Sequence, residues 1–124
     1  MNLFRIVPVI AALAVAAPAI AHPKLVTSSP AANATTGKIS TITLNYSEKL
    51  VPALSGAELI MTGMPGMADH PPMPITGLKT SVKGGKTLVV TLPRPLSAGT
   101  YKLNWHAVAA DTHRIKGTFA FRVK

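Results

Sequence analysis

The residues with the clearest chemical potential lie between positions 61 and 73, in a stretch that is rich in proline and glycine. Its methionines and its single histidine are Met61, Met64, Met67, His70 and Met73. Proline and glycine interrupt regular helix and strand, so we expect a loop whose side chains do not share one buried face. Thioethers beside an imidazole form a soft donor set that suits Cu(I) better than magnesium or calcium. The stretch therefore predicts a Cu(I) site, although methionine also fills irregular cores and forms peptide-binding surfaces.

A second candidate site would bind Cu(II) through nitrogen and oxygen. Cleavage of a signal peptide after Ala21 would make His22 the amino terminus, where the α-amine and the imidazole can chelate one ion together. Pro23 has no N–H, so the amide of the second residue cannot lose a proton to bind copper. His22 therefore needs other ligands, and Asp111 and His113 are two residues apart, which can place them on one side of an extended segment. This donor set favours Cu(II) among the divalent ions.

Other roles for these polar residues stay open. Asp111 and His113 can equally form a polar turn before the last strand. Glu48 and His106 are weaker candidates for the same site, because a lone glutamate after a strand is usually solvated and His106 can lie on an exposed face.

The composition indicates one exported domain. The 124-residue chain has no cysteine and a formal net charge of +9. Residues 1–21 are expected to be a signal peptide, with Arg5 followed by an apolar stretch and a small-residue cleavage site. Residues 22–124 would then form one domain that has no disulfide and no thiol for copper to oxidise. The basic residues are scattered without a stripe or stacking aromatic residues, so we expect no nucleic-acid partner, whereas acidic partners or anionic lipid would suit the charge.

Alternating apolar and polar residues predict the elements that must position these ligands. The expected strands are residues 24–28, 39–46, 57–61, 75–82, 87–92, 101–108 and 117–123. The stretch Lys83-Gly84-Gly85-Lys86 predicts a tight hairpin. Short strands with turn-rich connections predict an all-β protein, an antiparallel sandwich of about seven strands. Its core is expected to contain Trp105, Phe119 and Phe121.

Four stretches, in this order along the chain, together resemble the CopC family of periplasmic copper-resistance proteins. They are residues 22–30 (HPKLVTSSP), Tyr46-Ser47-Glu48, Met64-Pro65-Gly66-Met67, and Ala110-Asp111-Thr112-His113 with the following Lys116-Gly117. The resemblance covers essentially all of residues 22–124. It implies an immunoglobulin-like or cupredoxin-like Greek-key β-barrel or sandwich with two copper sites at opposite ends.

The resemblance also implies a ligand set for each site. By this similarity, His22, Asp111 and His113 match the Cu(II) ligands of the family, and Glu48 matches a residue also proposed for that site. The stretch that matches the methionine-rich Cu(I) loop contains Met61, Met64, Met67, His70 and Met73. An aspartate precedes His70, so the similarity does not fix the register of this histidine, nor does it fix which methionines bind together.

A periplasmic copper carrier, and not an enzyme, is the function that the resemblance implies. Its expected partners are copper ions, a CopD-like inner-membrane copper transporter and a periplasmic multicopper oxidase. One alternative is a copper monooxygenase with an amino-terminal histidine brace, for which this small chain shows no flat aromatic surface. The other is an interaction domain that binds no metal and whose methionines form an adhesive patch.

Overall fold

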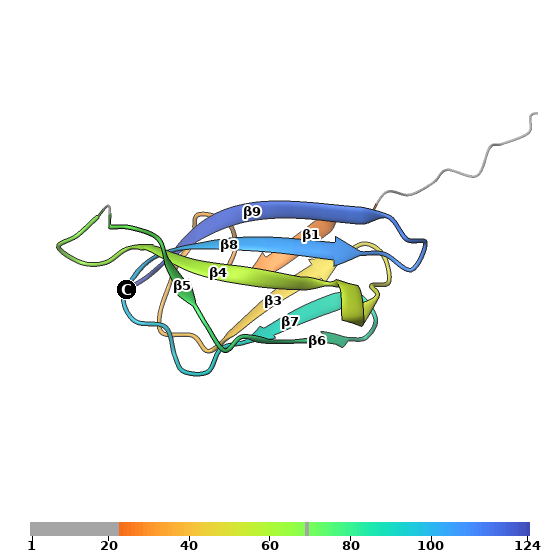
Figure 1. The fold of residues 1–124 in the computed structure, drawn as a ribbon, viewed down its shortest axis with the longest axis horizontal. Helices are drawn as coiled ribbons and strands as arrows, with labels where there is room; N and C mark the ends of the chain where they lie inside the picture. Colours follow the sequence, from red (N-terminus) through yellow and green to blue (C-terminus); the bar gives the residue numbers. More distant parts are fainter. Residues whose placement is uncertain (1–22, 69) are drawn as a thin grey trace, which may run out of the picture.

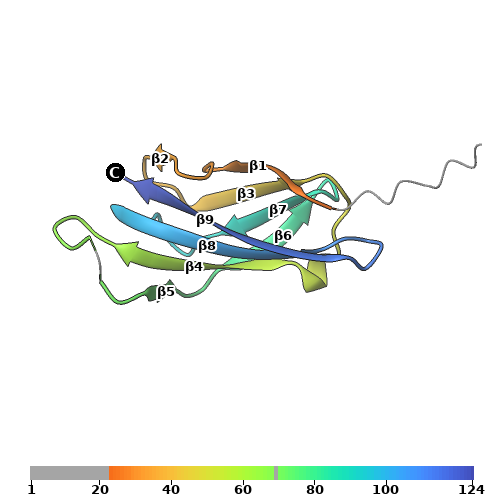
Figure 2. The same ribbon diagram turned by 90° about the horizontal axis from the view of Figure 1, so that it is seen from above.

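The computed structural model describes residues 23–68 and 70–124, which form two β-sheets packed as a sandwich (Figures 1 and 2). The first sheet has the spatial order β1 (Leu25–Ser29), β3 (Thr41–Tyr46), β7 (Thr87–Thr91) and β6 (Lys79–Lys83). The second has the order β2 (Thr35–Thr36), β9 (Arg114–Val123), β8 (Gly99–Val108), β4 (Gly56–Gly63) and β5 (Met73–Ile75). Neighbouring strands are antiparallel, except that β2 runs parallel to β9. The all-β sandwich is confirmed, and in the described residues the sheets do not close into a barrel.

The strand predicted over residues 75–82 is wrong as a single element. The structure divides it into β5, which belongs to the second sheet, and β6, which belongs to the first. Gly77 lies between them with a φ of 81°, in the left-handed region that interrupts an extended strand and that glycine adopts without steric cost. The other expected strands are present with shifted ends. The two-residue β2 was not expected, because it is too short to show alternation.

The core lies between the sheets and is formed by alternate residues of the central strands. Leu44 and Leu103 are completely buried. Phe121 is 2% exposed, which confirms its predicted place in the core. Trp105 and Phe119 are only partly buried and pack against the edge of this core. The prediction that these two aromatic residues belong to the core is therefore only partly correct, because they contact the core without being fully buried.

Trp105 covers one end of the core. Its strand partner is Gly117 on β9, and a Cβ atom at Gly117 would overlap Cζ2 of the indole ring. The ring of Tyr46 meets it edge-on at a centroid distance of 5.4 Å. Glycine at position 117 therefore leaves the space that the indole occupies.

The two candidate sites lie at opposite ends of the sandwich. The methionine loop follows β4 and projects at the left of Figure 1, whereas the turn between β8 and β9 lies at the right, and Figure 2 agrees. At the right-hand end the 3₁₀ helix η1 (Pro52–Leu54) precedes β4. The chain also enters β1 at this end, where Lys24 and Ser47 form two hydrogen bonds. No helix of residues 23–68 or 70–124 is long and apolar enough to cross a membrane.

Candidate metal centres

A tight turn forms the tip of the methionine loop. The amide of Met67 donates to the carbonyl of Met64 at 2.9 Å, and the amide of Met64 donates to the carbonyl of Met67 at 3.0 Å. Pro65 favours the φ of the second turn position, and Gly66 has a φ of 82°, as the third position of a type II turn requires. Because directly opposed residues project to the same face, the side chains of Met64 and Met67 leave this turn on one side.

A second opposed pair of methionines lies where β4 meets β5. Met61 is in register with Met73, so these two side chains also share a face. Met61 is only 6% exposed and belongs to the core, where a Cβ at Gly99 would lie 2.5 Å from its Cε. Met73 is 49% exposed. The pair thus runs from the core to the surface at the base of the loop.

Exposure separates the methionines by role. Met67 is 52% exposed, similar to Met73, and Met64 is partly buried against the core. Met61 therefore acts as a core side chain, which is one of the roles that the sequence leaves open. Packing in the core does not explain why positions 67 and 73 are methionine, because both side chains are about half exposed to solvent.

His70 has a ring nitrogen that forms no hydrogen bond with the part of the chain that the structure describes. Its Nδ1 lies 2.7 Å from the carbonyl oxygen of Pro71 and donates to it, which places the lone pair of the neutral ring on Nε2. Nε2 is shielded from solvent and has no hydrogen-bond partner among the described residues. Histidines that bind metal usually donate their other N–H to a carbonyl or a carboxylate. His70 is therefore in a suitable state to bind a soft metal ion beside the methionines.

The turn at the other end is organised by Asp111 and His113. The carboxylate accepts the backbone N–H of His113 at 3.1 Å through Oδ1, and the ring Nδ1–H at 2.7 Å through Oδ2. These bonds, chiefly the one from the side chain, hold the pKa of Asp111 below its usual value. Thr112 adopts a φ of 75° between them, and Ala109 closes the turn by donating to the carbonyl of His113. The expected polar turn is confirmed, and it keeps a carboxylate ionised beside an imidazole.

The structure also brings Glu48 to this turn. Glu48 and Asp111 line one hollow of about 320 Å³, together with Lys49, Lys86, Ala109 and Ala110. A hydrogen bond from the amide of Ala110 to the carbonyl of Lys49 joins the two segments. Glu48 follows β3 and Asp111 follows β8, so their proximity is a property of the folded chain.

His106 stands outside this arrangement. His106 is exposed on the outer face of the second sheet, opposite Lys116. His22 lies outside the described residues, whereas Pro23, which follows it in the sequence, is buried. Within residues 23–68 and 70–124, no group of three or more histidine, aspartate and glutamate side chains could hold a metal ion. A complete Cu(II) site at this turn would therefore need another donor, the role that the sequence analysis assigns to His22.

Tyr46 is a residue at this end for which the sequence suggested no role beyond a buried strand position. Its side chain is 3% exposed at the end of β3, and its hydroxyl has no hydrogen-bond partner among the described residues. Burial raises the pKa of this hydroxyl well above its ordinary value. The sequence feature that could have pointed to Tyr46 is the stretch Tyr46-Ser47-Glu48, because this tyrosine directly precedes the segment that approaches Asp111.

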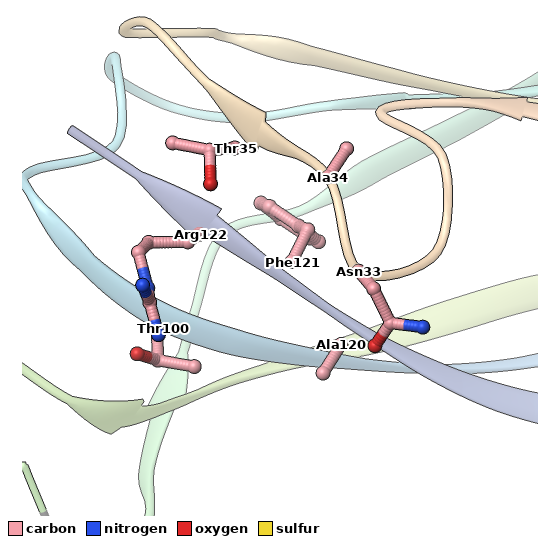
Figure 3. Close-up of a pocket in the computed structure, with 7 residues that line it drawn as sticks. All are labelled: Asn33, Ala34, Thr35, Thr100, Ala120, Phe121 and Arg122. Atoms are coloured by element: carbon pink, nitrogen blue, oxygen red, sulfur yellow. The ribbon is translucent and has the colours of Figure 1, made fainter.

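A smaller hollow of about 250 Å³ lies where β2 meets β9 and β8 (Figure 3). Arg122 extends toward Thr100, Thr35 and Ala34 lie above them in this view, and Asn33 lies at the right beside Ala120. Its lining contains no methionine, histidine or carboxylate side chain. This hollow therefore lacks the ligands that copper requires.

Comparison with known proteins shows the family of this chain. A sequence model of the CopC domain matches residues 25–124. Copper resistance protein C of Xanthomonas campestris pv. juglandis is 52% identical over 118 residues, covering 95% of this chain and 92% of that protein. Copper resistance protein C of Pseudomonas syringae pv. tomato is 50% identical over 117 residues, covering 92% of this chain and 90% of that protein.

A solved structure shows the same architecture. The crystal structure of PcoC, described as a methionine-rich copper resistance protein from Escherichia coli, matches with a TM-score of 0.75 and 43% identity. The match covers 84% of this chain and 100% of that one. With a family match across residues 25–124 and relatives that are half identical over nearly their whole length, this chain belongs to the CopC family of copper resistance proteins.

Proposed function

We propose that this protein carries copper in the periplasm, with a Cu(I) site in the methionine loop and a Cu(II) site at the other end of the sandwich. Membership of a copper-resistance family supports a copper-related role. The observation that carries the finer proposal is the Nε2 atom of His70, which is shielded, has no hydrogen-bond partner among the described residues and lies in the loop that presents the methionines. Carriage requires binding and release but no catalytic group.

The proposed Cu(I) ligands come from the methionine loop. They are drawn from Met61, Met64, Met67, His70 and Met73. Two cross-strand pairs, each on one face, bring thioethers to the base and to the tip of the loop. Thioethers are neutral and soft, so they select Cu(I) and compete little with protons.

The proposed Cu(II) ligands are the amino-terminal amine and ring of His22 with Asp111 and His113, and Glu48 is a further candidate. Removal of residues 1–21 as a signal peptide would create this site in the domain of residues 22–124. The bond from Nδ1 of His113 to Asp111 fixes the tautomer in which Nε2 carries the lone pair. The ionised carboxylate adds negative charge that favours a divalent cation.

The partners that we propose follow from the family resemblance. Copper would pass between this protein and a CopD-like inner-membrane transporter or a periplasmic multicopper oxidase. Sites at opposite ends allow one partner to approach the Cu(I) loop without covering the β8–β9 turn.

The exposed apolar side chains favour carriage over oxidation of a polysaccharide. The large hydrophobic residues that are exposed in the described part of the chain are Val26, Leu54, Met67 and Met73. None of them is aromatic, so these residues form no stacking surface for sugar rings.

Copper titration of three forms of the purified protein tests the proposal. One form begins at His22, a second carries one glycine before His22, and a control carries one glycine after Lys124. We expect the amino-terminal glycine to lower Cu(II) affinity at least about tenfold while Cu(I) affinity stays unchanged, because the amine chelate is lost. X-ray absorption should show sulfur ligands around Cu(I) only. Equal Cu(II) affinity in all three forms would refute the terminal chelate, and absence of sulfur around Cu(I) would refute the methionine site.

A further inference from the structure

A hollow of about 550 Å³ lies on the outer face of the second sheet. Apart from His106, the side chains that line it differ in type from the ligands proposed for the two copper sites. The hollow lies beside η1 and at the end of β8 and the start of β9. The lining residues are Ala53, Leu54, His106, Ala107, Val108, Arg114, Ile115 and Lys116. None of them is acidic and none is methionine, so a cation is a poor ligand for this hollow.

The strand register places the polar side chains on one face. His106 is directly opposite Lys116, and Val108 is directly opposite Arg114. Arg114 and Lys116 are two residues apart on β9, so both project outward, about 6.8 Å apart along the strand. The ring of His106 extends toward β4, where Gly56 has no side chain and a Cβ would lie only 3.1 Å from Cε1 of the ring.

None of the residues that line this hollow is acidic, and Arg114 and Lys116 are both exposed. In the described residues the ion pair that the structure shows joins His113 to Asp111, and it involves neither Arg114 nor Lys116. An Arg guanidinium matches a carboxylate through two parallel hydrogen bonds, and a nearby ammonium adds a third donor group. The lining therefore offers an anion two positively charged side chains.

The remaining wall and the floor are apolar. Val108 is 4% exposed and forms part of the floor, and Leu54 is 48% exposed on the η1 side. An exposed leucine beside two cations favours a ligand that has an apolar part next to its negative charge.

We infer that this hollow binds a carboxylate that carries an apolar group. Arg114 and Lys116 hold the carboxylate, and Leu54 and Val108 contact the apolar part. Two sources have this chemistry, a free organic acid and the carboxyl terminus of a partner chain that ends in an apolar residue. The inference does not depend on copper carriage, because none of the Cu(II) ligands proposed above, His22, Asp111, His113 and Glu48, and none of the methionines lines the hollow.

Nuclear magnetic resonance titration with phenylacetate tests the inference. We expect amide shifts at residues 53–54, 106–108 and 114–116. Arg114→Gln and Lys116→Gln should each weaken binding about threefold, since exposed charge contacts contribute modestly. Leu54→Ala should weaken phenylacetate but leave acetate binding unchanged. Lys79→Gln and Lys83→Gln, on β6 of the other sheet, are the matched charge controls and should change nothing.

Neutral and peptide ligands complete the test. Phenylacetamide should bind more weakly than phenylacetate. Equal binding of the two, unaltered affinity in both β9 variants, or shifts spread over all surface lysines would overturn the inference. A tetrapeptide Ala-Ala-Leu-Phe with a free carboxyl terminus that binds more tightly than phenylacetate supports a chain terminus as the ligand. Weaker binding of the peptide than of phenylacetate supports a free organic acid.

Discussion

Replacing His70 with leucine should raise the stability of the copper-free protein while lowering its affinity for Cu(I). The two effects have opposite signs because the shielded Nε2 has no hydrogen-bond partner among the described residues. A buried acceptor without a partner costs about 1–3 kcal/mol, and leucine removes that cost. The variant also loses the bond from Nδ1 to the carbonyl of Pro71, a bond at the surface that contributes about 0.5–1.5 kcal/mol.

The difference between these terms sets the expected magnitude. The free energy of unfolding of the copper-free variant should increase by about 1 kcal/mol. Loss of one ligand should lower Cu(I) affinity at least about tenfold, which corresponds to about 1.4 kcal/mol. A histidine that served only the structure of the loop would instead lower stability when it is removed and leave Cu(I) affinity unchanged.

Two measurements on the same samples decide between these roles. Urea unfolding of the chelator-treated protein, followed by the fluorescence of the single Trp105, gives the stability. Competition with a chromophoric Cu(I) chelator gives the affinity. His106→Leu is the matched control, because this histidine is exposed at the other end of the sandwich and should not affect Cu(I) binding. A His70→Leu variant that is less stable and retains full Cu(I) affinity would refute the reasoning.

Three further substitutions test the elements that support the sites. Gly117→Ala should lower the free energy of unfolding by about 1–3 kcal/mol, because its Cβ would overlap Trp105, and urea unfolding against a Gly37→Ala control, where a Cβ meets nothing, measures this. Tyr46→Phe should leave stability unchanged or raise it by up to about 1 kcal/mol, because it removes a buried hydroxyl that has no hydrogen-bond partner among residues 23–68 and 70–124. A clear loss of stability would show that the hydroxyl is satisfied. Asp111→Asn removes a carboxylate whose pKa is lower in the folded protein than its ordinary value near 3.8. The ionised carboxylate therefore stabilises the fold above pH 3.8, and this contribution disappears as the pH falls through the pKa of the folded state. Unfolding measured at pH 7 and at pH 2 should therefore show the variant less stable than the wild type only at pH 7, and an equal difference at both values would contradict the bond to His113.

The same depressed pKa constrains how copper affinity depends on pH. Between neutral pH and about pH 5, Asp111 stays ionised, so any loss of Cu(II) affinity must come from protonation of the amine and imidazole ligands. Thioethers take up no proton in this range, and Cu(I) affinity should change much less. Titrations of both oxidation states at the two pH values measure the difference.

Local patterns in the sequence predicted most of the strands and the chemistry of both ends. Alternation at period two located β3, β8 and most of β9, because the two faces of a strand meet different environments. Pro65 and Gly66 predicted a break in regular structure, and they occupy the two central positions of the turn at the loop tip. The sequence also predicted one ligand set of sulfur donors and one of nitrogen and oxygen donors, because ligand preference depends on the type of donor atom and not on the fold; both sets stay predictions.

Only the tertiary structure determined how deeply each residue is buried and which residues lie next to it. Met61 and Met67 have the same side chain and lie in the same stretch, yet Met61 belongs to the core and Met67 is exposed. The difference arises because Met61 lies in β4, which packs in the second sheet, whereas Met67 lies in the loop that follows this strand. Glu48 and Asp111 are far apart in the sequence and share a hollow because β3 and β8 end together at one side of the sandwich. Such contacts depend on the order of the strands in each sheet and on the packing between the sheets. The periodicity of a single strand carries no information about either.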